Sequence, residues 1–106
     1  LLHSAAADLQ LGRVLFWSGE IDGSLAQAEK VLQKTPDNRD ALMLKADIFR
    51  VQRRFDEAIA IYQSLLNRGE DFEARNGLAY TYLASGNIPE AKRHFGLLVP
   101  ALPYER

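Results

Sequence analysis

Residues 46–62, ADIFRVQRRFDEAIAIY, decide the fold of this chain, because their pattern of small and large side chains occurs three times. The matching sets are Gly12-Leu15-Ser24-Ala28, Ala46-Phe49-Ala58-Tyr62 and Ala79-Tyr82-Ala91-Phe95. Matching positions lie 34 residues apart from the first copy to the second and 33 from the second to the third. A period of this length is typical of stacked helical hairpins, because one hairpin cannot bury its apolar face alone. The pattern therefore predicts an all-α solenoid of three antiparallel helical hairpins.

Composition narrows the function classes. Apolar residues make up 47% of the 106 residues and charged residues 25%, as in an ordinary globular domain. The net charge of −1 argues against a nucleic-acid partner, which favours a basic surface. No apolar run approaches the roughly 18 residues that span a bilayer, so we expect no direct membrane insertion by this segment. The chain opens at Leu1 without an initiating methionine, and we expect a fragment of a longer protein.

Apolar period and turn residues predict six helices, at about 6–18, 22–35, 39–52, 56–68, 73–85 and 89–99. Gly19 and Gly86 fall at the turns inside the first and third hairpins, where a residue without a Cβ is favoured. Arg53 holds that place in the second hairpin, so this turn is either strained by about 1 kcal/mol or shaped differently.

Side chains at three- and four-residue spacing predict a shared core. Its expected apolar members include Val14, Leu15, Leu25, Ala28, Val31, Leu32, Ile48, Phe49, Ile59, Tyr62, Leu65 and Leu66. Small residues at matched places in each copy should let the helices approach closely. These are Gly12, Ser24, Ala46, Ala58, Ala79 and Ala91.

The spacing from Gly12 to Pro36 resembles the tetratricopeptide repeat, and so do the stretches 46–65 and 79–98. The three copies cover about 5–38, 39–71 and 72–105 within one domain, 1–106. This resemblance implies a right-handed superhelix that serves as a non-catalytic scaffold for protein–protein interaction. It also implies that the first helix of each copy lines a concave groove for a peptide or protein segment.

The groove residues that this resemblance implies are Leu9, Arg13, Phe16, Trp17, Met43, Asp47, Arg50, Asn76, Tyr80 and Leu83. Trp17, Met43 and Tyr80 would form an aromatic and adaptable platform, flanked by charged side chains that orient the ligand. Core packing is the alternative reading for Phe16 and Trp17. The clamp with which chaperone adaptors grip a terminal carboxylate is absent, because its positions hold Leu9, Met43 and Leu44 among others. Arg13 and Asn76 alone could still hold an acidic group.

Enzyme chemistry is not expected. His3 and His94 are the only histidines, and neither has a metal-binding spacing. His94 follows Glu90 by four residues, which predicts an exposed helix pair. With no cysteine and no phosphate-binding glycine loop, the sequence predicts no cofactor.

Two further expectations concern context. Leu97, Leu98, Val99 and Leu102 follow the third copy and predict an uncovered apolar face at the C-terminal end, which could support self-association. Residues 12–19 also resemble tetratricopeptide segments of bacterial proteins that precede an outer-membrane barrel or serve exopolysaccharide secretion. This resemblance leaves bacterial periplasm and cytoplasm both open as locations.

Overall fold

The computed structural model describes residues 4–99, which form six α-helices and no strand. The helices are α1 (Ala5–Trp17), α2 (Ile21–Lys34), α3 (Arg39–Val51), α4 (Phe55–Leu66), α5 (Phe72–Ser85) and α6 (Ile88–Leu98). The predicted ranges agree with these bounds to within two residues. Within the described part of the chain, no helix is long and apolar enough to cross a membrane.

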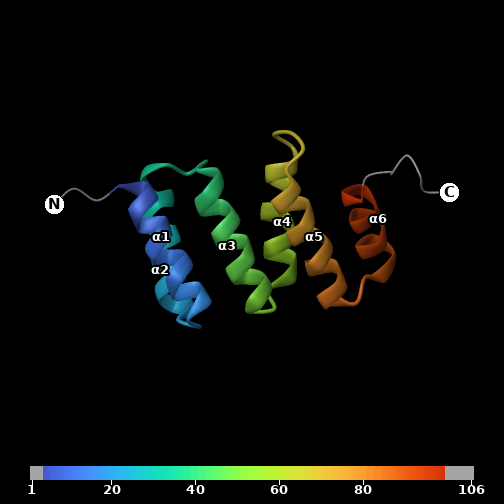
Figure 1. Ribbon diagram of the computed structural model, residues 1–106, viewed down its shortest axis with the longest axis horizontal. Coiled ribbons are helices and arrows are strands. Elements are labelled where there is room, and N and C mark those ends of the chain that lie inside the picture. The colour runs from blue at the N-terminus through green and yellow to red at the C-terminus, as the bar shows by residue number, and fades with distance from the viewer. Residues whose placement is uncertain (1–3, 100–106) are drawn as a thin grey trace.

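The helices pair as three hairpins, α1 with α2, α3 with α4 and α5 with α6, set in a row along the molecule (Figure 1). Each hairpin packs on the next through its second helix, because α2 contacts α3 and α4 contacts α5. The first helices also meet, since α3 contacts both α1 and α5. The all-α solenoid is confirmed, and the three first helices make one continuous surface.

The turns inside the hairpins all use a left-handed residue. Gly19 and Gly86 have φ of 84° and 88°, and Arg53 has φ of 63°. The left-handed conformation costs a side-chain-bearing residue about 1–2 kcal/mol. Arg53 recovers part of this cost because its guanidinium lies 5.0 Å from the centre of the Phe55 ring.

The first helix of every hairpin begins at a capping side chain. Ser4, Asn38 and Asp71 accept a hydrogen bond from the backbone N–H three residues ahead, which satisfies one of the amides left free at a helix start. A capping residue in the local sequence therefore marks the start of each of these three helices.

The core consists of two clusters joined through α3. One surrounds Phe49, Tyr62 and Leu78, and the other surrounds Val31 and Ile48. The predicted small residues are all buried. At Gly12 a Cβ would lie 2.9 Å from Leu44 Cδ2, so a larger residue there would force the buried Leu44 side chain of α3 to move.

Two predictions about burial are wrong. Val14 is 63% exposed, because it points away from α2 and α3 on a side of α1 that no described helix covers. His94 does lie 3.8 Å from Glu90, as its spacing predicts, but it is buried and not exposed. Its ring stacks on Tyr82 with centroids 5.5 Å apart, and Arg75 Nη1 lies 2.8 Å from its Nδ1. The hairpin turn folds α6 so that this side of the helix faces α5, and the spacing to Glu90 does not reveal that.

Candidate peptide-binding groove

The surface formed by α1, α3 and α5 contains two adjoining hollows. The first measures about 220 Å³ and lies between α1 and α3, reaching Glu73 of α5. Its walls are Arg13, Phe16, Trp17, Arg39, Asp40, Met43, Leu44, Asp47 and Glu73. The second measures about 160 Å³ and lies between α3 and α5. Its walls are Met43, Asp47, Arg50, Phe72, Glu73, Asn76, Gly77 and Tyr80.

The hollows bring together most of the residues predicted for the groove. Both contain Met43 and Asp47, so they form one continuous depression across the three helices. Leu9 and Leu83 line neither hollow. Leu9 is 4% exposed and belongs to the core cluster under α1, so its assignment to the groove is corrected. Leu83 is exposed at the C-terminal end of α5, beyond the second hollow.

The two aromatic residues at the end of α1 have different environments. Trp17 is 84% exposed, whereas Phe16 is half-buried and packs on the core cluster below α1. The two rings meet edge to face with centroids 6.4 Å apart. Core packing therefore describes Phe16 in part and does not describe Trp17.

A hydrogen-bonded group of three side chains supports the hollows and is called the floor here: Asp47 and Arg50 line the hollows, whereas Tyr62 is fully buried and lines neither. The hydroxyl of Tyr62, which reaches over from α4, donates to Asp47 Oδ1. Arg50 Nε donates to the same hydroxyl at 3.4 Å, and Arg50 Nη2 lies 3.6 Å from Asp47 Oδ1. Burial raises the pKa of Asp47 above its ordinary value, against the opposing effects of Tyr62 and Arg50. Burial also raises the pKa of Tyr62 far above its usual range, so the hydroxyl remains a neutral donor.

Gly77 makes room for this floor. A Cβ at Gly77 would lie 2.5 Å from both Cε1 and Cζ of Tyr62, closer than packed atoms can approach. Tyr62 can therefore cross from α4 to α3 only because α5 carries no side chain at this point. Gly77 lines the second hollow and was not predicted to do so, although a glycine inside a predicted helix is a signal of close packing. Tyr62 was predicted for the core, and it lies there.

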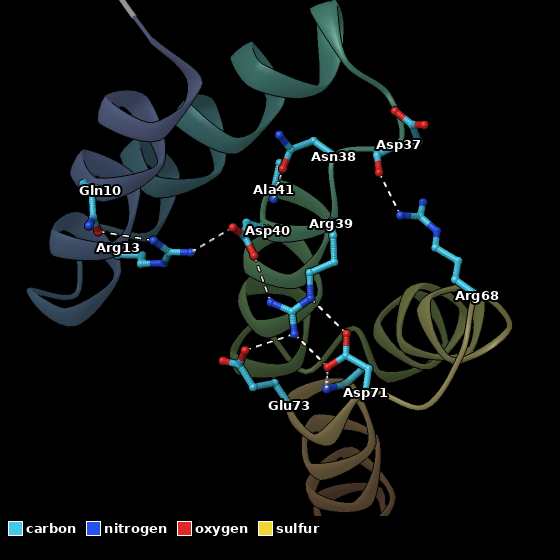
Figure 2. Close-up of polar contacts among 11 residues, drawn as sticks. Gln10, Arg13, Asp37, Asn38, Arg39, Asp40, Ala41, Arg68, Asp71 and Glu73 are labelled. Atoms are coloured by element: carbon cyan, nitrogen blue, oxygen red, sulfur yellow. Dashed lines mark hydrogen bonds and ion pairs between the residues drawn. The ribbon is translucent and has the colours of Figure 1, made fainter.

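The N-terminal ends of α3 and α5 are joined by an ion-pair network around Arg39 (Figure 2). Arg39 Nε and Nη2 donate to the two oxygens of Asp71 at 2.9 and 2.7 Å. The same guanidinium reaches Asp40 at 2.9 Å and Glu73 at 3.0 Å, while Arg13 of α1 lies 3.9 Å from Asp40. Arg39 holds the pKa of Asp71 below its usual range. The role of Arg39 is not visible in the sequence, because its partner in space is 32 residues away.

The groove carries paired charges. Arg13, Arg39 and Arg50 each lie within ion-pair distance of an aspartate on the same surface. Opposite charges in contact cancel most of their long-range field. Apolar contacts and hydrogen bonds, and not net charge, are therefore the means of recognition that this surface offers. Among residues 4–99, no group of three His, Cys, Asp or Glu side chains could hold a metal ion.

These features define a helical-repeat protein of the kind that presents a concave binding surface. Two tetratricopeptide repeat family models match the chain, at residues 9–71 and 49–103, and the chain belongs to the tetratricopeptide repeat family. The chain is also similar to a protein described as "Protein CTR9 homolog" from Arabidopsis thaliana, with 28% identity over 96 residues. That match covers 89% of this chain and 9% of the Arabidopsis protein, so the chain spans under a tenth of that relative.

Membership of this family indicates a general kind of function. Tetratricopeptide repeats mediate protein–protein interaction, and the family is typically a non-catalytic scaffold. The match bears on neither a bacterial source nor a cell compartment, so the envelope location stays a prediction.

Proposed function

We propose that this chain is a non-catalytic interaction module that binds an extended segment of a partner protein across α1, α3 and α5. The observation that carries this proposal is the exposure of Trp17, whose side chain is 84% exposed and lines the 220 Å³ hollow. A tryptophan buries a large area at low entropic cost, and tryptophan is enriched among residues that dominate binding energy.

The shape of the groove supports an extended ligand. Two hollows in line, sharing Met43 and Asp47, suit successive side chains of one segment better than a single compact molecule. Met43 can adjust to different side chains, because its thioether is unbranched and flexible. The floor below is held by the Tyr62 hydrogen bonds, so little conformational freedom remains to be lost there on binding.

The two edges of the groove differ in chemistry, which gives the ligand a direction. The first helices run parallel, with their C-terminal ends along one edge (Figure 1). That edge presents Trp17, Val51 and Leu83, all exposed. The opposite edge carries the Arg39 network with Glu73. We infer that a bound segment places apolar side chains along the first edge and polar groups along the second.

The test is to select peptides from a random library on the immobilised chain and measure their affinity by calorimetry. Trp17→Ala should weaken a selected peptide by about 2 kcal/mol or more, which is roughly thirty-fold. Tyr80→Ala should weaken it as well, because Tyr80 lines the second hollow.

Leu97→Ala is the matched control, because Leu97 is an exposed large apolar residue on α6, outside both hollows. Its affinity should equal that of the unmodified chain. If Trp17→Ala and Tyr80→Ala bind as tightly as this control while remaining folded, the groove is not the binding surface.

A further inference from the structure

Three side chains line both hollows of the groove, namely Met43, Asp47 and Glu73. A segment that crosses the groove must therefore pass over them between one hollow and the next. Met43 is apolar and buried, whereas Asp47 and Glu73 are carboxylates. Glu73 lies in the first turn of α5, and its side chain is 67% exposed. The junction of the two hollows is therefore acidic and open to a ligand.

Both hollows have aromatic walls. In the first, the walls include Phe16 and Trp17 of α1, and in the second they include Phe72 and Tyr80 of α5. Phe72 is 65% exposed and Tyr80 48%, so part of each ring is accessible to a ligand. Aromatic walls favour an apolar side chain, because covering them removes apolar surface from water. Along the groove, an aromatic hollow is thus followed by an acidic junction and a second aromatic hollow.

The Arg39 network does not fully neutralise Glu73. It contains two guanidiniums, those of Arg13 and Arg39, and three carboxylates, those of Asp40, Asp71 and Glu73. Asp71 receives two hydrogen bonds from Arg39, whereas Glu73 receives one, through Oε1 (Figure 2). Among residues 4–99, Oε2 of Glu73 has no hydrogen-bonding partner. The network therefore has one carboxylate in excess, and Glu73 is the most exposed of the three.

The third guanidinium in the walls of the hollows does not supply the missing charge. Arg50 is paired with Asp47 and donates to the Tyr62 hydroxyl. Burial is the main cause that raises the pKa of Asp47, and the negative charge of Glu73 raises it further. Asp47 and Glu73 therefore repel each other across the junction. A ligand cation placed between them would be attracted to both carboxylates at short range, where no long-range field of the groove is needed.

We propose that the groove selects a segment with a basic side chain between two apolar ones, and that Glu73 is the residue that determines this specificity. The cationic end of the basic side chain lies at Glu73, and its aliphatic stem lies along the flexible thioether of Met43. The two apolar side chains enter the aromatic hollows. The basic side chain belongs to the segment of the proposed function, on which this inference rests.

The geometry of an extended chain sets the spacing of these three side chains. Successive side chains point to opposite sides, so the basic one can face the edge with Glu73 while its apolar neighbours face the edge with Trp17 and Leu83. Packed helices lie about 8–10 Å apart, and an extended chain advances about 3.3 Å per residue. The two apolar residues should therefore lie about two or three positions apart, with the basic residue between them.

The experiment is selection of random peptides on the immobilised 106-residue chain and on its Glu73→Gln variant. Glutamine keeps an oxygen that accepts from Arg39 but removes the charge. Lysine or arginine should be enriched between two apolar positions on the unmodified chain and not on the variant. In calorimetry, Glu73→Gln should weaken a selected peptide by about fivefold, and so should replacing its basic residue by glutamine. Making both changes should weaken binding no further than either alone, because they remove the same contact.

Glu70→Gln is the matched control. Glu70 is 64% exposed and pairs with Arg75 at 2.6 Å, so it resembles Glu73 in exposure and in having an arginine partner. It lines neither hollow, and its loss should leave peptide affinity unchanged. Circular dichroism checks that both variants are folded.

The outcomes separate this inference from the proposed function. If Trp17→Ala weakens the selected peptides but Glu73→Gln does not, or if no basic residue is enriched, the basic specificity is wrong while the groove still binds a segment. Enrichment of acidic residues would also overturn it and would indicate recognition by Arg13. If no peptide is selected, or if Trp17→Ala and Tyr80→Ala bind as tightly as the unmodified chain, both the proposed function and the basic specificity are wrong.

Discussion

Gly77 and Gly96 both lie inside helices, yet replacing each by alanine should change stability in opposite directions. A Cβ at Gly96 in α6 meets no atom within 4 Å. Gly96→Ala should therefore gain the ordinary advantage of alanine over glycine in a helix, about 0.5–1 kcal/mol. At Gly77 the same atom would enter the ring of Tyr62.

The size of the Gly77→Ala effect follows from how Tyr62 is held. Tyr62 is fully buried, and its hydroxyl is bonded to Asp47 and Arg50, so the ring cannot swing aside freely. Overpacking costs about 1–3 kcal/mol, and a buried polar group that loses its partner costs about 1–3 kcal/mol more. After subtracting the helix gain of up to about 1 kcal/mol, we expect Gly77→Ala to destabilise the chain by about 3 kcal/mol, the middle of the resulting range.

The assay is urea unfolding followed by far-UV circular dichroism, together with thermal melting. Gly77→Ala should lower Tm by about 12–24 °C, and Gly96→Ala should raise it by about 4 °C. Combining Gly77→Ala with Tyr62→Leu should show strong coupling, because without the ring the alanine has nothing to meet. If Gly77→Ala is as stable as the unmodified chain, or if the two changes add independently, the close approach at Gly77 does not determine the groove floor.

Three further predictions concern pH and the turns. Burial and the charges of Arg93 and Arg75 lower the pKa of His94. As pH falls, His94 therefore becomes protonated in the unfolded chain before it does so in the folded chain. Stability should therefore fall as pH drops below about 6.5, and His94→Phe should remove this part of the pH dependence in urea titrations. The Arg39 guanidinium lowers the pKa of Asp71, so stability from that pair should be present above about pH 4 and lost as pH falls further. Asp71→Asn, which keeps a capping side chain, should lose less stability than the unmodified chain between about pH 5 and pH 2. Arg53→Gly should raise the unfolding free energy by about 0.5 kcal/mol, because relief of the left-handed strain exceeds the lost contact with the Phe55 ring; a lower value would mean that the turn is not strained.

Much of the fold could be predicted from the sequence, because its signals are local. Small residues such as Ala46 and Ala58 mark where two helices of one hairpin cross, and Gly19 and Gly86 mark the turns. Both kinds of signal act within about 20 residues. The repeat period and the turn residues are therefore enough to predict the helix pairs and the turns between them.

The candidate groove was less completely predictable. Arg13, Asp47 and Tyr80 followed from their place in the repeat, and they do line the hollows. The assignment of Leu9 failed, because Leu9 is buried in the core under α1 and lines neither hollow. Met43, at the same repeat position in α3, is also buried in the core but lines both hollows. Arg39 was missed because its partner Asp71 belongs to the next hairpin. A charged residue at the start of a helix does not by itself indicate which distant residue it pairs with.

The sequence by itself determined the helices, their turns and the repeated packing of small against large residues, since each depends on neighbours in the same hairpin. Only the tertiary structure decided which copies of a repeated position are buried. Val14 and Ile48 hold the same place in successive repeats, yet the first is exposed and the second fully buried. The physical reason is that burial depends on whether another helix lies alongside, and α2 covers α3 where no described helix covers α1.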